Sequence, residues 1–157
     1  MRTSTTIVMP LRAGLIVGEA PGPGQAPGST FTGPSGERLS RLLGDEWHRV
    51  LDGVNLLDHQ PLGRGGSEFD LGAARAAASI LRRTSPYFRD ERLVIFAGKR
   101  VARAFGWTFG YFELDAILTG QRLCRAVAVP HPSGRNRWWN DPANARRAAK
   151  YFKEILR

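Results

Sequence analysis

The sequence predicts a three-layer α/β/α fold around a central, mainly parallel sheet of four strands. Two observations lead to this expectation. Short apolar runs of strand length alternate with longer segments of helical periodicity, which is the order expected of a parallel sheet with helices on both faces. The 157 residues also contain no internal repeat and no linker that would divide them, so we expect a single domain over residues 1–157.

The expected strands are four apolar runs bounded by turn-forming residues. In chain order they cover residues 13–18, 53–57, 93–97 and 123–129. Loops rich in Gly and Pro or in polar residues follow three of them, at residues 19–36, 58–69 and 131–141. The aromatic segment 106–120 fits neither a helix pattern nor a strand pattern.

The expected helices occupy most of the remaining chain. They cover residues 36–51, 71–83, 99–105 and 142–156. The first has apolar residues at helical spacing, beginning with Leu39 and Leu42. Asp70 is a suitable N-cap for the second, and Asp141 followed by Pro142 is a typical opening for the last.

Charge is the most informative part of the composition. Lys and Arg together number 23 against 14 acidic residues, a formal net charge of +9, and this excess favours a nucleic acid partner over an unremarkable basic surface. No apolar run approaches the roughly 18 residues that a membrane span needs. We see no signal peptide, and the single cysteine, Cys124, allows neither a disulfide framework nor a cysteine metal cage, so we expect a cytoplasmic protein without metal or cofactor. We also expect a monomer.

Two motifs each follow an apolar strand directly. Gly18-Glu19-Ala20-Pro21-Gly22 follows the apolar run that ends at Val17, and His131-Pro132-Ser133-Gly134 comes one residue after the apolar run that ends at Val129. The carboxyl ends of parallel strands lie at one edge of a sheet, where ligands bind. The Glu-bearing loop and the His-bearing loop are therefore expected to face one cleft.

These motifs resemble those of the uracil-DNA glycosylase superfamily, and two further segments extend the likeness. Residues 28–36 resemble a G-x-P-F-x-G-x-x-G loop, and residues 54–61 resemble a strand that begins with Asn and leads into a Pro-containing loop. The likeness is closest to the branch whose first motif reads GEAPG. Iron–sulfur members of that branch bind a cluster through four cysteines, and since this chain has one, we expect no cluster.

The resemblance implies roles for four side chains. His131 would donate a hydrogen bond to uracil O2 as charge develops there, Phe31 would stack on the extruded base, and Asn55 would read the base edge. Glu19 would orient water or stabilise the sugar cation, and Asp58 is the second candidate for this role. The alternatives are that Phe31 only packs its loop onto the core and that Asn55 only bonds its own backbone.

The first motif also predicts the shape of the base pocket. The resemblance places Gly18, Ala20 and Gly22 against the base. Some superfamily members use an Asp at the position of Ala20 for the attacking water, and Ala20 cannot replace that carboxylate here. The most uracil-restricted members have a Tyr at the position of Gly22, so this chain is expected to accept bases substituted at carbon 5.

The loop after His131 is expected to contact DNA. The resemblance places a groove-probing loop there, with Ser133, Gly134, Arg135 and Arg137 as the contacts. The residues Trp138 and Trp139 suit stacking on DNA and packing under the last helix equally well. Of the other histidines, His48 is expected to be structural, and His59 stands where the iron–sulfur members have a cluster cysteine.

The sequence therefore predicts a monofunctional DNA base glycosylase, one that forms no lysine Schiff base, acting on uracil or a 5-substituted pyrimidine. A non-catalytic module of the same fold that binds a deaminated or modified base is the alternative, supported by the missing motif Asp. A basic domain that binds nucleic acid without specificity is a third possibility.

Overall fold

A computed structural model describes residues 10–22, 25–26, 30–89, 92–119 and 122–156. Its centre is a five-stranded sheet with the order β2-β1-β3-β5-β4. The strands are Gly14–Gly18 (β1), Leu51–Asn55 (β2), Leu93–Ala97 (β3), Asp115–Thr119 (β4) and Arg122–Val129 (β5). The strands β2, β1, β3 and β5 are parallel, and β4 pairs with β5 in the antiparallel sense at the edge.

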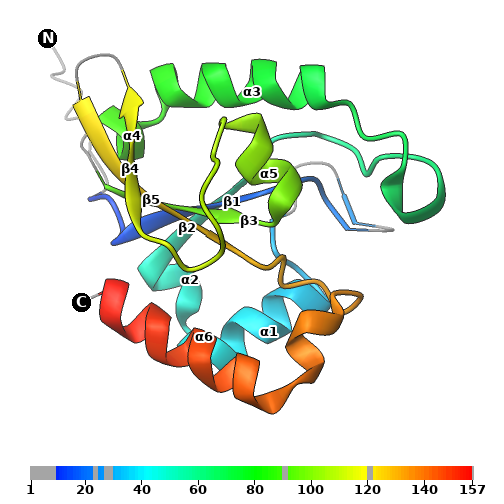
Figure 1. Cartoon of the computed structure of the whole chain (residues 1–157), viewed down its shortest axis with the longest axis vertical. Coiled ribbons are helices and arrows are strands. Elements are labelled where there is room, and N and C mark those ends of the chain that lie inside the picture. The colour runs from blue at the N-terminus through cyan, green and yellow to red at the C-terminus, as the bar shows by residue number, and fades with distance from the viewer. Residues whose placement is uncertain (1–9, 23–24, 27–29, 90–91, 120–121, 157) are drawn as a thin grey trace, which may run out of the picture.

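Helices cover both faces of the sheet. The helices α3, α4 and α5 lie on one face, and α1, α2 and α6 lie on the other (Figure 1). Their bounds are Pro34–Leu43 (α1), Trp47–Val50 (α2), Leu71–Thr84 (α3), Pro86–Arg89 (α4), Lys99–Ala104 (α5) and Pro142–Ile155 (α6). Two 3-10 helices, Arg64–Gly66 (η1) and Arg137–Asn140 (η2), lie in loops. The expected three-layer α/β/α architecture is confirmed.

The core is divided by the sheet into two clusters. Side chains of β3 alternate between them: Val94 and Phe96 pack with α3 and α5, whereas Ile95 packs with α1 and α6. Each of these side chains is fully buried. This two-sided burial explains why β3 reads in the sequence as an unbroken apolar run.

The structure differs from the sequence-based expectation in several elements, including the short helix α4, which was not expected. The segment 106–120 contributes the strand β4, so the sheet has five strands. The expected helix 36–51 is interrupted at Gly44, whose φ of 95° ends α1 before α2 begins. The second strand lies two residues earlier than expected, so Asn55 closes β2, where the sequence suggested that it opens the strand.

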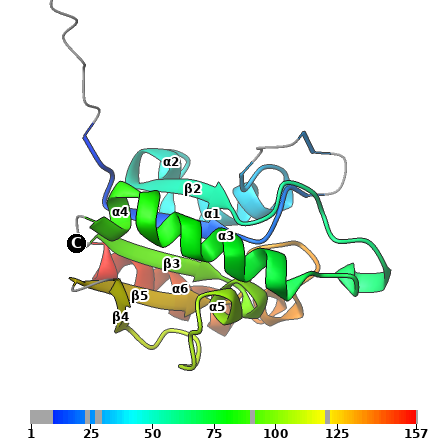
Figure 2. The same ribbon diagram turned by 90° about the horizontal axis from the view of Figure 1, so that it is seen from above.

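The register of the sheet brings four strand ends to one edge. Gly18 pairs with Asn55, and Ala97 pairs with Val129. The loops that leave β1, β2, β3 and β5 therefore start side by side. In Figure 2 the loop between β2 and α3 extends from this edge beyond the rest of the described chain.

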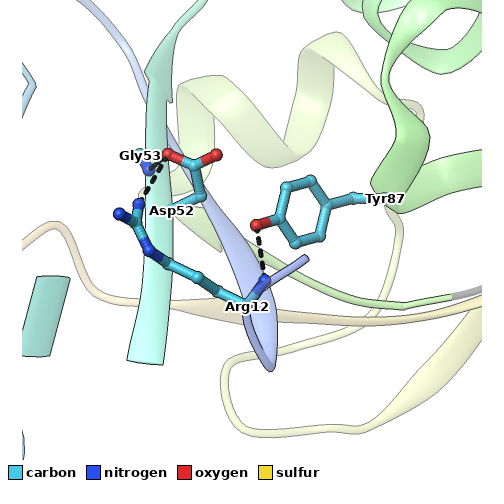
Figure 3. A network of polar contacts seen from close by, with 4 residues as sticks. All are labelled: Arg12, Asp52, Gly53 and Tyr87. Carbon is cyan, nitrogen blue, oxygen red and sulfur yellow. Dashed lines mark hydrogen bonds and ion pairs between the residues drawn. The ribbon is translucent and has the colours of Figure 1, made fainter. Parts of the chain in front are cut away.

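A polar network holds the opposite edge of the sheet (Figure 3). The Arg12 guanidinium donates to Asp52 Oδ1 at 3.2 Å, and the same oxygen accepts the Gly53 N–H at 3.0 Å. The Arg12 N–H donates to the Tyr87 hydroxyl at 3.1 Å. The segment before β1 is thus tied to β2 and α4, away from the edge where the loops after β1, β2, β3 and β5 begin.

None of the helices in the described part of the chain is long and apolar enough to cross a membrane.

Candidate active site

A cleft of about 760 Å³ opens at the edge where the four parallel strands end. Its walls come from four separate segments. The loop after β1 supplies residues 19–22, 25 and 31–32, and the first turn of α1 supplies residues 34–35. The loop after β2 supplies residues 60–61 and 65–66. Asn55, Arg100, His131 and residues 133–135 complete the lining.

Most of the residues that the sequence nominated line this cleft. They are Glu19, Ala20, Gly22, Phe31, Asn55, His131, Ser133, Gly134 and Arg135. Gly18 lies directly beneath, since a Cβ there would come within 2.6 Å of Asn55 Oδ1 and 3.0 Å of Phe31 Cζ. Arg137 and Asp58 are exposed and are not part of the lining.

Phe31 is held in a strained position between the core and the cleft. Its φ of 49° lies in the left-handed region, which is uncommon for a bulky residue and often marks a functional site. The ring packs against Gly18 and Gly53 and meets Trp47 edge-on at 6.3 Å. It is only 9% exposed, yet it lines the cleft. Packing and base stacking, which the sequence presented as alternatives, are therefore compatible.

His131 is fixed in one hydrogen-bonding state. The Ser133 N–H donates to His131 Nδ1 at 3.0 Å, so in the neutral ring the proton sits on Nε2. Burial lowers the pKa of His131 from 6.5 to about 4. At neutral pH the side chain is thus an uncharged imidazole with one N–H to donate.

The backbone of the His131 loop is held by side chains of η2, of its N-cap residue and of α1. The His131 carbonyl accepts from Trp139 Nε1 at 2.9 Å and from Asn136 Nδ2 at 3.2 Å. Arg38 of α1 donates to the Ser133 carbonyl at 3.1 Å and lies over the Trp139 ring. These bonds hold the loop that carries the imidazole.

The two tryptophans after His131 pack against the protein. Trp139 is 7% exposed and belongs to the core cluster beneath α6. Trp138 packs against the same cluster, with its ring 4.7 Å from that of Trp139 and 5.5 Å from that of Phe112. Of the two readings left open by the sequence, packing under the last helix agrees with this arrangement.

Arg100 is a site residue that the sequence did not reveal. It lies in the first turn of α5 and its Nη1 donates to Glu19 Oε1 at 3.0 Å. Its Nη2 donates to the Gly65 carbonyl at 3.2 Å, and its guanidinium stacks on Phe69 at 4.9 Å. One side chain thus joins the loops after β1 and β2. The only available signal was that Arg100 follows closely after the end of a buried strand.

The remaining polar side chains of interest are exposed. Gln25 accepts a hydrogen bond from Thr32 Oγ1 at 2.9 Å on the rim of the cleft. His48 lies on α2 beside Trp47, and His59 is exposed and absent from the cleft wall. Within the described ranges, no three His, Cys, Asp or Glu side chains are grouped to hold a metal ion.

Comparison with known families accounts for this arrangement. No curated protein matches the sequence. A family model described as the Uracil DNA glycosylase superfamily matches residues 12–157, which include every segment that lines the cleft. The chain belongs to the Uracil DNA glycosylase superfamily.

Proposed function

We propose that this protein is a monofunctional DNA glycosylase that hydrolyses the N-glycosidic bond of uracil or a 5-substituted pyrimidine. The observation that carries the proposal is the neutral His131, held by the Ser133 N–H in the same cleft as Phe31 and Asn55. Family membership supports DNA as the substrate, and the net charge of +9 agrees with it. The protein acts as a single-domain monomer without a cofactor.

The cleft suits the chemistry of base removal. The target nucleotide leaves the duplex, and its base stacks on the Phe31 ring, an interaction worth about 1–3 kcal/mol. The Asn55 amide has both a donor and an acceptor for the edge of the base. As the C1′–N bond breaks, the base leaves with the bonding electrons, and the His131 Nε2–H donates to the oxygen where negative charge accumulates. A neutral donor in a fixed position suits this task because it needs no reorganisation.

Glu19 is the acid closest to this chemistry. Its carboxylate lines the cleft and is held by Arg100 at 3.0 Å. A water molecule adds to C1′ of the cation-like sugar and gives up a proton, which the Glu19 carboxylate accepts. The products are the free base and an abasic site. Asp58 is exposed outside the cleft wall, which supports Glu19 for this role.

The missing side chain at Gly22 leaves room for a substituent at carbon 5 of the base. Gly22 lines the cleft, and the nearest described side chain to a Cβ placed there is Gln25, at 3.5 Å. The contacting atom is the Gln25 Cγ, so the space beside Gly22 is bounded there by a methylene group. The chain is a divergent member of the GEAPG branch that lacks the four cluster cysteines.

The non-catalytic alternative also has one supporting observation, since Ala20 supplies no acid at the third position of the motif. Incubation with a duplex that contains one uracil distinguishes the two functions. We expect the wild-type protein to produce alkali-labile breaks at the uracil. We expect His131→Ala to lose these breaks and to retain its affinity for DNA. Specific binding without any breaks would instead establish the binding module.

Substrate range is tested with the same duplex carrying 5-substituted uracils. We predict that Gly22→Tyr abolishes excision of 5-substituted bases and spares uracil, because the new ring occupies the space beside carbon 5. Gly22→Ala is the control, since its Cβ would make only an ordinary contact with Gln25. Wild-type protein that rejects every 5-substituted base would refute this assignment of Gly22.

A further inference from the structure

Gly98 is in direct contact with the His131 side chain. It is the residue between β3, which ends at Ala97, and α5, which begins at Lys99 (Figure 1). A Cβ placed at Gly98 would lie 3.2 Å from His131 Cβ, 3.6 Å from Cδ2 and 3.8 Å from Cγ. The first of these distances is shorter than the separation that packed carbon atoms prefer. The His131 side chain therefore occupies the space that a side chain at position 98 would need.

The backbone at Gly98 is held on both sides. Its N–H donates to the Val129 carbonyl at 2.8 Å, and its carbonyl accepts from the Ala102 N–H of α5 at 3.1 Å. Its φ of 100° and ψ of 162° lie in a region that glycine adopts far more readily than any other residue. The start of α5 therefore cannot move away from the imidazole without disturbing one of these bonds.

The imidazole is also confined from the opposite direction. Its Nδ1 accepts from the Ser133 N–H at 3.0 Å, and the His131 carbonyl accepts from Trp139 Nε1 at 2.9 Å. A methyl group at position 98 would force a neighbour to shift by a few tenths of an ångström. Because the backbone is bonded on both sides of the contact, the ring is the part that can turn. Turning the ring would strain its bond to Ser133.

We propose that Gly98 is a positioning residue for His131, whose imidazole lies against the bare backbone of Gly98 and is thereby kept buried, with Nδ1 on the Ser133 N–H and Nε2 available to a ligand in the cleft. This arrangement belongs to the free protein. Its consequence for catalysis rests on the proposed function, since it requires His131 to act on the leaving base.

Burial is the cause of the lowered pKa of His131. Three charged side chains line the cleft with the ring, and a fourth follows Gly98 in the chain. These side chains are Glu19, Arg100, Arg135 and Lys99. None of them is a cause of the shift, so a change that uncovers the ring is expected to raise its pKa towards the ordinary value of 6.5.

Gly44 provides a matched control. Its φ of 95° and ψ of 162° are nearly those of Gly98, so an alanine at either position meets the same backbone strain. No described atom lies within 4 Å of a Cβ placed at Gly44. Gly98→Ala therefore differs from Gly44→Ala by crowding His131.

The first test needs no activity. Long-range 1H–15N spectra of the free protein report the tautomer and titration of its three histidines, and the His131 signals are those that His131→Gln removes. The wild-type ring is expected to stay neutral, with its proton on Nε2, until the pH approaches 4. Gly98→Ala is expected to raise the midpoint by about one pH unit and to populate the other tautomer. Gly44→Ala is expected to match the wild type, and a wild-type titration in Gly98→Ala would overturn the inference.

Thermal unfolding provides a test even if Gly98→Ala alone does not fold. His131→Gly removes both the Cβ and the ring that a new methyl group would meet. Gly98→Ala is expected to cost less stability in this background than in the wild-type protein, whereas Gly44→Ala is expected to cost the same in both. Equal costs of Gly98→Ala in the two backgrounds, or a double variant that does not fold, would overturn the inference.

Single-turnover excision of uracil from duplex DNA measures the effect on catalysis. Gly98→Ala is expected to slow base release by about tenfold with little change in DNA affinity, because the donor is misplaced. Gly44→Ala is expected to retain the wild-type rate. A wild-type rate in Gly98→Ala would overturn the positioning role. If the wild-type protein releases no base although His131 titrates as described, the glycosylase assignment fails and the contact between Gly98 and His131 stands.

Discussion

At the scale of single residues, one backbone N–H determines what His131 can do. The Ser133 N–H occupies Nδ1, and burial disfavours the charged ring and lowers its pKa to about 4. An unfolded histidine titrates near 6.5. Between these two values the unfolded chain binds a proton that the folded chain does not, so stability falls as the pH falls through this window. Over the whole window, the free energy of unfolding falls by about 3 kcal/mol.

The pH profile of excision follows from this pKa. If the neutral ring is the active form, the excision rate is expected to stay level from pH 8 to about pH 5 and to fall towards pH 4. Initial rates of uracil release under single-turnover conditions would measure this. The profile is repeated with Glu19→Gln, so that the carboxylate proposed to accept the proton of water is absent and the profile reports on His131. An acidic limb between pH 6 and 7 would contradict the assignment.

The contact between Glu19 and Arg100 was the feature of the site that the sequence predicted least. Glu19 could be nominated because it lies in a recognisable motif, and His131 for the same reason. Arg100 could not, because it is 81 residues from Glu19 in the chain and no local pattern links the two. The contact exists only because β1 and β3 are neighbours in the sheet and the loops after them begin side by side.

The pairing of Glu19 with Arg100 is predicted to appear as coupling in a double-mutant cycle. Arg100→Gln and Glu19→Gln are each expected to lower kcat/KM. The double variant is expected to lose less than the sum, with a coupling of about 1 kcal/mol, or fivefold. A partly exposed pair contributes modestly to stability, so thermal melts should change little.

Arg100→Lys is the control for this cycle, since it keeps the charge and replaces the planar guanidinium, which reaches Glu19 and Gly65 through two different nitrogens, with a single ammonium. It is expected to recover part of the loss in kcat and to leave the pH profile in place. Additive effects of the two Gln substitutions would mean that Arg100 acts on the Gly65 loop alone.

At the scale of elements, α1 supports the loop that carries His131. Arg38 donates to the Ser133 carbonyl and lies over the Trp139 ring, whose own N–H bonds the His131 carbonyl. The imidazole is therefore positioned by a helix that starts about one hundred residues earlier in the chain. Such support keeps reacting groups within the small tolerance that catalysis requires.

We predict that Arg38→Ala lowers kcat by about tenfold, with little change in the affinity for DNA, because the loop that carries His131 loosens. Amide exchange over residues 131–139 is expected to accelerate. Arg41→Ala on the same helix is the matched control, since Arg41 is exposed and only reaches Glu37 at 4.0 Å. Equal losses in both variants would indicate a general effect of helix charge.

Elements with a strong local signal were predictable, and those that depend on neighbours were not. Asp70 and Asp141 cap α3 and α6 as expected, accepting from Ala73 N and Ala143 N. The strand β4 escaped notice because an edge strand needs little apolar alternation and is defined by pairing with β5. The early end of α1 depends on the left-handed conformation of Gly44.

At the scale of the whole molecule, the fold brings several arginines to the edge of the sheet where the cleft opens. The formal charge of +9 is a property of the sequence, but the sheet register decides which cations reach the cleft. Arg135 lines it, Arg64 stands on the loop beside it, and Arg137 is exposed on η2 immediately after the His131 loop. DNA laid across this edge would meet all three.

The dependence of DNA affinity on salt measures how many of these cations meet phosphates. Each phosphate contact with duplex DNA contributes about 0.9 to the slope of log K against log salt. Arg135→Ala and Arg137→Ala are each expected to reduce the slope by about one, and the double variant by about two. Lys153→Ala is the control, because Lys153 is exposed in the last turn of α6, the end remote from η2.

Fluorescence anisotropy at four salt concentrations gives the slopes. A slope unchanged by both arginine substitutions would place the duplex away from the His131 loop. A change with Arg135 alone would confine the footprint to the cleft itself, since Arg137 lies outside its wall.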